Sequence, residues 1–115
     1  MKIEGTAKRL TIYIGETDHY ERKPLYKAIV EALRQKGIAG ATVVRGIEGF
    51  GKTSRIHTAA ILRLSEDLPI VIQVIDKEER IESVLPVIED MVAKGLVTLE
   101  DVEVVTYVSD KDASA

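Results

Sequence analysis

A glycine-rich segment in the middle of the chain has the residues of a phosphate-binding loop. Residues 46–53 read Gly-Ile-Glu-Gly-Phe-Gly-Lys-Thr and fit the spacing G-x-x-x-x-G-K-T. Glycines at this spacing let backbone N–H groups converge on phosphate oxygens, and the lysine adds a positive charge. Arg45 directly precedes the segment and is a further candidate cation. The residues predicted to contact an anionic ligand are Arg45, Gly49, Phe50, Gly51 and Lys52.

The same glycines have two other interpretations. They could form a bulge or turn in a long hairpin and bind nothing. They could also belong to a P-loop nucleotide hydrolase, since the apolar strand ending in Asp76 imitates the magnesium-binding strand of such enzymes. Against the hydrolase, a P-loop domain needs a parallel sheet of about five strands, which rarely fits a chain of this length. A complete β-α unit also precedes the loop, and residues 54–58 are a poor helix start.

No other group of residues predicts catalysis. The chain has no cysteine, which excludes disulfides and thiolate metal sites, and it has only two histidines. His57 has no recognisable Ser/His/Asp partners. His19, with Glu16 and Asp18 nearby in the sequence, could bind a stray metal ion, whereas Asp76 is better explained as a helix cap. We therefore assign no catalytic residue, no metal ligand and no required cofactor.

Length and composition indicate one globular domain. The 115 residues are enough for one core, and 45% apolar with 30% charged residues is an ordinary globular balance. The net charge of −3 and the lack of a basic stripe argue against a nucleic-acid partner. The longest apolar run, residues 68–75, is far shorter than the roughly 20 residues of a membrane helix. Residues 1–5 lack the apolar stretch of a signal peptide, so we expect a cytoplasmic protein without membrane insertion.

The spacing of apolar residues predicts four strands and two helices in the order β-α-β-β-α-β. Period-two alternation marks the strands, and helical spacing follows Pro24 and Asp76. Pro86 predicts a kink or an early break in the second helix, because proline removes a hydrogen bond and clashes with the preceding turn. Residues 52–67 are ambiguous between strand and helix. The predicted strands are residues 9–15, 40–45, 70–75 and 102–108, and the helices run from Pro24 to Gly37 and from Asp76 to Gly95.

This element order is that of a ferredoxin-like βαββαβ sandwich, an α+β fold with an antiparallel sheet. We expect a single domain over residues 1–115, with its core at 8–108 and a flexible tail at 109–115. Both helices of such a fold cover one face of the sheet, yet strands such as 70–75 are apolar on both faces. The second face therefore needs a cover, which would be another subunit or a long loop folding back.

Two stretches of the chain resemble the PII signalling superfamily. Residues 37–44, leading into Gly-Phe-Gly-Lys at 49–52, resemble the second PII strand running into its long, mobile T-loop. The Leu-Pro pair before the strand 70–75 resembles the PII return strand. The variant at 45–51, with Ser-Glu-Asp-Leu-Pro at 65–69, is similar to the uncharacterised PII-like family of the PII (nitrogen regulatory protein) superfamily. The resemblance covers roughly residues 8–108.

The resemblance implies a trimeric, non-enzymatic signalling protein. In PII proteins, clefts between neighbouring subunits bind an adenine nucleotide, which reorders the T-loop and changes the partner protein that is bound. By this resemblance, Thr42 would lie near the base, and Gly49, Gly51 and Lys52 would approach phosphates. Lys94, Gly95 and Leu96 would come from the neighbouring subunit. The loop 46–66 would contact an unidentified partner protein.

The sequence also departs from PII proteins in ways that change the expected ligand. Residues 94–98 lack the glycine-rich, lysine-bearing second loop of PII proteins, and residues 103–105 contain no arginine. A weakly charged nucleotide, AMP or ADP, is therefore a better candidate than ATP. Residues 46–66 contain no tyrosine, so uridylylation of a loop tyrosine does not apply. A metal-responsive trimer similar to the CutA proteins, which share the fold, is a further alternative.

Overall fold

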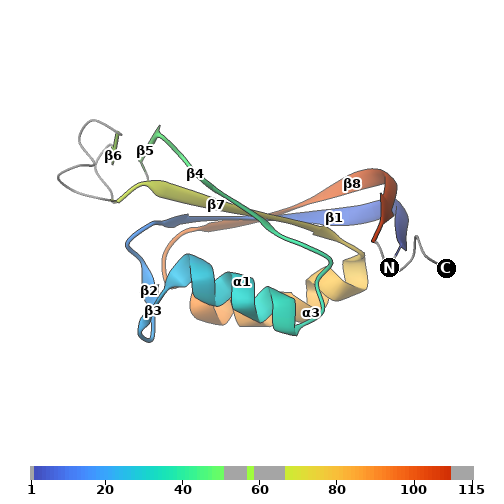
Figure 1. The fold of residues 1–115 in the computed structure, drawn as a ribbon, viewed down its shortest axis with the longest axis horizontal. Helices are drawn as coiled ribbons and strands as arrows, with labels where there is room; N and C mark the ends of the chain where they lie inside the picture. The colour runs from blue at the N-terminus through green and yellow to red at the C-terminus, as the bar shows by residue number, and fades with distance from the viewer. Residues whose placement is uncertain (1, 51–56, 59–66, 110–115) are drawn as a thin grey trace.

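A four-stranded sheet with two helices on one face forms the body of the protein (Figure 1). The structure is a computed structural model that describes residues 2–50, 57–58 and 67–109. The six principal elements follow the predicted order. They are β1 (Lys2–Gly15), α1 (Leu25–Gln35), β4 (Thr42–Arg45), β7 (Pro69–Asp76), α3 (Glu78–Met91) and β8 (Leu96–Val108). Two short pairs are added, β2 (His19–Tyr20) with β3 (Lys23–Pro24), and β5 (Glu48–Gly49) with β6 (His57–Thr58).

The sheet has the strand order β4-β7-β1-β8, and all three of its ladders are antiparallel. This is the order of the split βαβ unit, with the first and third principal strands in the centre. The predicted ferredoxin-like α+β fold is therefore confirmed. The parallel sheet that a P-loop hydrolase needs is not the sheet that forms here.

The core lies between the sheet and the helices. Every second residue of β1 from Leu10 to Ile14, and of β7 from Ile70 onward, points toward the helices and is buried, as the period-two pattern predicted. The helices contribute residues at spacings of three and four. The buried core comprises Leu10, Ile12, Ile14, Ile70, Ile72 and Val74 of the sheet, and Leu25, Ala28, Ile29, Leu33, Ile81, Val84, Ile88 and Met91 of the helices.

Helix α1 begins and ends close to the predicted residues. Pro24 is the residue before its first turn, where a fixed φ and a missing N–H cost nothing. At the other end, the Gly37 N–H donates to the Arg34 carbonyl, and the Ile38 N–H donates to the Leu33 carbonyl. These two bonds form a Schellman motif, which satisfies carbonyls that the helix leaves unpaired. Gly37 therefore closes the helix as predicted.

The early break that Pro86 offered as one alternative does not occur in helix α3. The helix runs through Pro86, which is exposed while Val84 and Ile88 are packed in the core. It ends at Met91 instead of reaching Gly95. Its N-cap is Lys77, so the prediction that Asp76 caps the helix was wrong.

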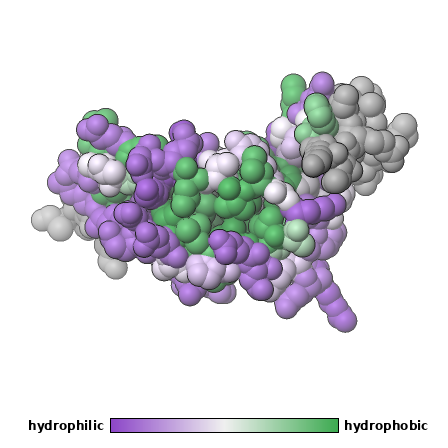
Figure 2. All heavy atoms as spheres, turned by 180° about the vertical axis from the view of Figure 1, so that it is seen from behind, coloured by the Kyte–Doolittle hydropathy of each residue, from purple (hydrophilic) through white to green (hydrophobic). Residues whose placement is uncertain are grey.

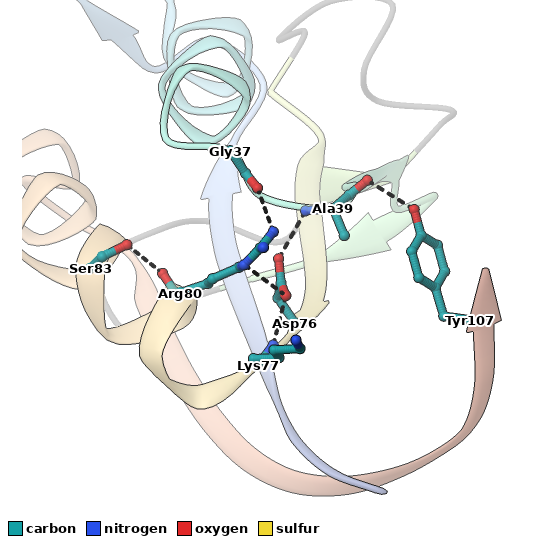
Figure 3. A network of polar contacts seen from close by, with 7 residues as sticks. All are labelled: Gly37, Ala39, Asp76, Lys77, Arg80, Ser83 and Tyr107. Carbon is teal, nitrogen blue, oxygen red and sulfur yellow. Dashed lines mark hydrogen bonds and ion pairs between the residues drawn. The ribbon is translucent and has the colours of Figure 1, made fainter. Parts of the chain in front are cut away.

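Asp76 is instead the centre of a buried polar network (Figure 3). Its Oδ2 accepts a hydrogen bond from the Ala39 N–H at 2.9 Å, and its Oδ1 accepts one from the Lys77 N–H at 2.7 Å. The Arg80 Nε lies 3.9 Å from Oδ1, and its Nη1 donates to the Gly37 carbonyl at 3.1 Å. One carboxylate thus joins the loop after α1 to the start of α3.

Strands β1 and β8 are longer than predicted and pair along most of their length. Beyond the sheet they form a two-stranded ribbon, with a register shift between Ile3 and Gly5. Cross-strand ion pairs follow the ladder, with Lys8 to Asp101 at 2.5 Å and Arg9 to Glu100 at 2.7 Å. The ends of these strands are polar, so the sequence shows no apolar alternation there that would predict a strand.

The sheet face opposite the helices consists of residue rows that run across the strands. The register aligns Val44, Val71, Tyr13 and Leu96 in one apolar row across all four strands. The adjacent row is polar and consists of Thr42, Gln73, Thr11 and Thr98. The apolar row is exposed or half-buried in the single chain. The predicted apolar second face is therefore present, as this row at one end of the sheet together with the exposed Ile75 beyond the polar row.

A second exposed apolar region lies along the sheet edge formed by β8. Figure 2 views the molecule from this side and shows apolar side chains gathered in its middle. β8 is an edge strand that pairs with β1 on one side, and its Leu96 and Leu99 are exposed. Among the described residues, neither helix is long and apolar enough to cross a membrane.

Candidate functional site

The described part of the glycine loop and the 94–96 segment lie at the same end of the sheet. At this end β1 and β4 finish while β7 and β8 begin. The register pairs Gly15 with Pro69, Arg45 with Ile70, and Tyr13 with Leu96. Antiparallel pairing thereby brings segments 25 to 83 residues apart in sequence to the same end of the sheet. We call this end of the sheet, where β1 and β4 finish and β7 and β8 begin, the loop end.

The base of the glycine loop packs directly on Pro69. The Gly46 N–H donates to the Pro69 carbonyl at 2.7 Å. A Cβ at residue 46 would lie 2.7 Å from Pro69 Cγ, so only glycine fits there without a shift. Glu48 and Gly49 then pair with Thr58 and residue 57 as strands β5 and β6. This part of the loop is a hairpin base.

The tip residues of the described loop face outward. Ile47 is 79% exposed and Phe50 is 73% exposed. Gly49 is half-buried because it rests against Pro69. The other two predicted loop residues, Gly51 and Lys52, lie outside the described residues, and so does most of the loop 46–66. The described part thus presents two large apolar side chains beside the last residue of β4.

Arg45 forms an ion pair with Glu16 that the sequence did not predict. Its Nη2 forms an ion pair with the Glu16 Oε2, across the start of β7. The Arg45 side chain is 56% exposed and the Glu16 side chain is 24% exposed. More than half of the Arg45 side chain is therefore exposed at the loop end.

Lys94 is paired with Asp18, an acid two residues after Glu16. Its Nζ lies 3.7 Å from the Asp18 Oδ1, and the Asp18 Oδ2 accepts a hydrogen bond from the Gly15 N–H at 2.9 Å. The segment 15–18 therefore lies between the two predicted cations. Only its acidic residue types signalled it in the sequence, and they had suggested metal binding.

The metal interpretation of this segment does not match its contacts. Glu16 and Asp18 are engaged by Arg45 and Lys94, and the His19 Nδ1 lies 2.7 Å from the Thr17 carbonyl oxygen. Within residues 2–50, 57–58 and 67–109, no three potential metal ligands gather at one point. The acidic side chains of this segment form ion pairs with Arg45 and Lys94.

Gly95 has a backbone conformation that residues with a side chain rarely adopt. Its φ is +146°, and a Cβ there would lie 2.5 Å from the Tyr13 carbonyl oxygen. Glycine at this position lets β8 start beside β1, which sets Leu96 opposite Tyr13. The residue thus has a structural role at the loop end whether or not it contacts a ligand.

Gly95→Ala is expected to lower the free energy of unfolding by about 1–3 kcal/mol, since it combines backbone strain with a close contact. The matched control is Gly40→Ala, because nothing lies within 4 Å of a Cβ at that position. Urea unfolding of both variants measures the difference. Equal stability of the two variants would contradict the conformation at Gly95.

The predicted ligand residues do not converge within one chain. Thr42 and Arg45 are three residues apart on β4, so their side chains point to opposite faces. Arg45 lies on the edge strand β4 and Lys94 precedes the other edge strand, β8. Three strand spacings separate the backbones of these edges, which is about 14 Å. The two side chains reach toward Glu16 and Asp18 of one segment, so within a single subunit acidic groups lie between the two cations.

A surface pocket of about 270 Å³ lies at the C-terminal end of α1. Its lining is mostly apolar, with Arg34 as a charged member, and none of the predicted ligand residues belongs to it. Its lining residues are Val30, Leu33, Arg34, Ile38, Ala39, Gly40 and Ala41. This pocket therefore does not carry the phosphate chemistry that the glycine loop predicts.

Known proteins resemble this chain either in sequence or in fold. A UPF0166 protein of Aquifex aeolicus is 43% identical over 98 residues, which cover 85% of this chain and 92% of that protein. The structure of CPII, a nitrogen regulatory PII-like protein from Thiomonas intermedia K12 bound to ADP, AMP and bicarbonate, matches with a TM-score of 0.69. That match has 20% identity and covers 86% of this chain and 88% of CPII.

A putative PII-like signaling protein from Thermus thermophilus matches with a TM-score of 0.60 and 21% identity, over 88% of this chain and 90% of that protein. These structural matches confirm the PII-like fold. Residues 7–104 also match the family DUF190, described as "Uncharacterized ACR". The resemblance to an uncharacterised PII-like family is thereby confirmed, and the chain belongs to the DUF190 family.

Proposed function

We propose that this protein is a non-enzymatic, PII-like signalling protein that binds AMP or ADP in clefts between the subunits of a homotrimer. The observation that carries the proposal is the placement of Arg45 and Lys94 at opposite edges of one end of the sheet. A second subunit that sets its β8 edge against the β4 edge would bring both cations to one ligand. The ADP and AMP bound to CPII, a protein of the same fold, support an adenine nucleotide as that ligand.

The apolar row supplies a reason for subunits to associate at this same end. Val44, Val71, Tyr13 and Leu96 lie across the strands beside the base of the glycine loop. Apolar side chains exposed in a continuous row lose that exposure when a second chain covers them, and the burial of apolar area favours association. Contact through this row would place the loop of one subunit near its neighbour.

The charges around the loop end favour a ligand with few phosphates. Both described cations of the predicted site are matched by carboxylates, Arg45 by Glu16 and Lys94 by Asp18. A triphosphate would add negative charge to a region that is close to neutral. A nucleotide with one or two phosphates needs less compensation, which supports AMP or ADP.

The exposed loop residues support a role in contacting a partner protein. Ile47 and Phe50 project from the part of the loop nearest Arg45. Large apolar side chains at an exposed position are typical of residues that become buried in a complex. A nucleotide bound beside Arg45 would alter the loop base, and the loop 46–66 would pass that change to the partner.

Isothermal titration calorimetry with AMP, ADP and ATP tests the proposal. We expect AMP or ADP to bind, and we expect Arg45→Ala to weaken that binding about tenfold, because it removes a charge-assisted hydrogen bond. Lys23→Ala is the control, since Lys23 is an exposed cation paired with Glu31 outside the predicted site.

Two results would contradict the proposed function. Absence of binding by all three nucleotides would exclude nucleotide sensing. Release of phosphate from ATP in the presence of magnesium would instead favour the hydrolase. Unchanged affinity in Arg45→Ala would remove that residue from the site while leaving nucleotide binding in place.

A further inference from the structure

One short segment supplies the acidic partners of both described cations at the loop end. Glu16 pairs with Arg45 on one side, and Asp18 pairs with Lys94 on the other. Residues 15–18 follow the central strand β1, so they lie between the two edges of the sheet. An anion that approaches either cation therefore meets a carboxylate that is already there.

The backbone of this segment is anchored on both sides. The Glu16 N–H donates to the Leu68 carbonyl at 2.7 Å. The Thr17 hydroxyl donates to the Asp67 Oδ1 at 3.0 Å. On the other side, the Leu25 N–H donates to the Asp18 carbonyl at 2.7 Å. The Glu16 side chain can rotate away from Arg45, but its backbone cannot carry the carboxylate far from the loop end.

We propose that Glu16 is a specificity-determining residue, which competes with anionic ligands for Arg45 and discriminates against those with more charge. The inference rests on the proposed function, since it concerns the ligand that Arg45 binds. A ligand phosphate must displace the Glu16 carboxylate from the guanidinium. The displaced carboxylate then stays nearby and repels every further phosphate charge.

The size of the discrimination follows from Coulomb's law. A carboxylate about 8 Å from an added phosphate charge, screened at physiological salt, lowers affinity roughly 1.5- to 4-fold per charge. The pair itself is partly exposed and contributes little to folding. Removing the carboxylate is therefore expected to change ligand preference with little effect on stability.

The test compares the wild-type protein with Glu16→Gln in titrations with AMP, ADP and ATP without magnesium. We expect the variant to gain affinity for all three, about twofold for AMP and about tenfold or more for ATP. The gain should shrink at high salt. Glu31→Gln is the matched control, because it removes the same charge from an exposed pair with Lys23 and should change no affinity.

A second ligand series separates this inference from the proposed function. Inorganic phosphate, pyrophosphate and tripolyphosphate carry the same rising charge but no adenine. Suppose that no nucleotide binds but that Glu16→Gln still strengthens tripolyphosphate binding most. The proposed function then fails, while the inference that Glu16 discriminates against highly charged anions is supported. An equal gain for every ligand, no gain, or a loss of affinity in Glu16→Gln would overturn the inference.

Discussion

Val71→Glu is expected to dissociate the proposed oligomer and to weaken self-association by at least about 100-fold, because it would bury an unpaired charge at the proposed subunit contact. Val71 lies in the middle of the apolar row, between Val44 and Tyr13. It is only half-buried in the single chain, so the subunit itself should keep its fold. Sedimentation velocity across a concentration series measures the association, and circular dichroism monitors the fold.

Gln73→Glu is the matched control for this experiment. Gln73 lies on the same strand and the same face, two residues further along, but in the polar row with Thr42 and Thr11. A carboxylate there should weaken association much less than one in the apolar row. If Val71→Glu associates as tightly as wild type, or if the wild-type chain is monomeric at micromolar concentration, the subunit contact through this row is refuted.

Asp76→Ala is expected to lower the free energy of unfolding by about 3–5 kcal/mol, because it leaves two backbone donors and a neighbouring cation without their carboxylate. The donors are the Ala39 and Lys77 N–H groups, and the cation is Arg80. For a chain of this size the melting temperature should fall by roughly 10–20 °C. Urea unfolding followed by circular dichroism gives both the midpoint and the slope.

Two further variants test whether the loss of stability is specific to the contacts of the Asp76 carboxylate. Asp76→Asn retains one acceptor oxygen in the same volume, so its loss of stability should be intermediate. Asp101→Ala removes a carboxylate from an exposed pair with Lys8, and its effect should stay below about 1 kcal/mol. If Asp76→Ala were no more destabilised than Asp101→Ala, the network in Figure 3 would not stabilise the loop after α1.

The fold could be predicted from sequence because its determinants are local and periodic. Alternating Leu10, Ile12 and Ile14 define a strand face by themselves, and Gly37 ends a helix through bonds made within six residues. The prediction failed where distant contacts outweigh local preference. Helix α3 does not break early at Pro86, because core packing on both sides outweighs one lost hydrogen bond.

The candidate site could be predicted only in part. The glycine spacing identified the loop and its cations from residue types alone. The acids Glu16 and Asp18 were visible in the sequence, but their partners Arg45 and Lys94 are about 30 and 75 residues away. Such pairs leave no periodic signal, because they depend on which strands become neighbours.

By itself, the sequence determined which residues face a core, where the helices begin and end to within a few residues, and that the second sheet face is partly apolar. Those properties depend on neighbours within a few residues along the chain. Only the tertiary structure decided that the apolar residues align as one row at the loop end, and that Asp76 joins two connections instead of capping a helix. It also decided that one acidic segment lies between the two cations. The physical reason is that strand order and register bring together groups far apart in the chain, and no local pattern encodes those distances.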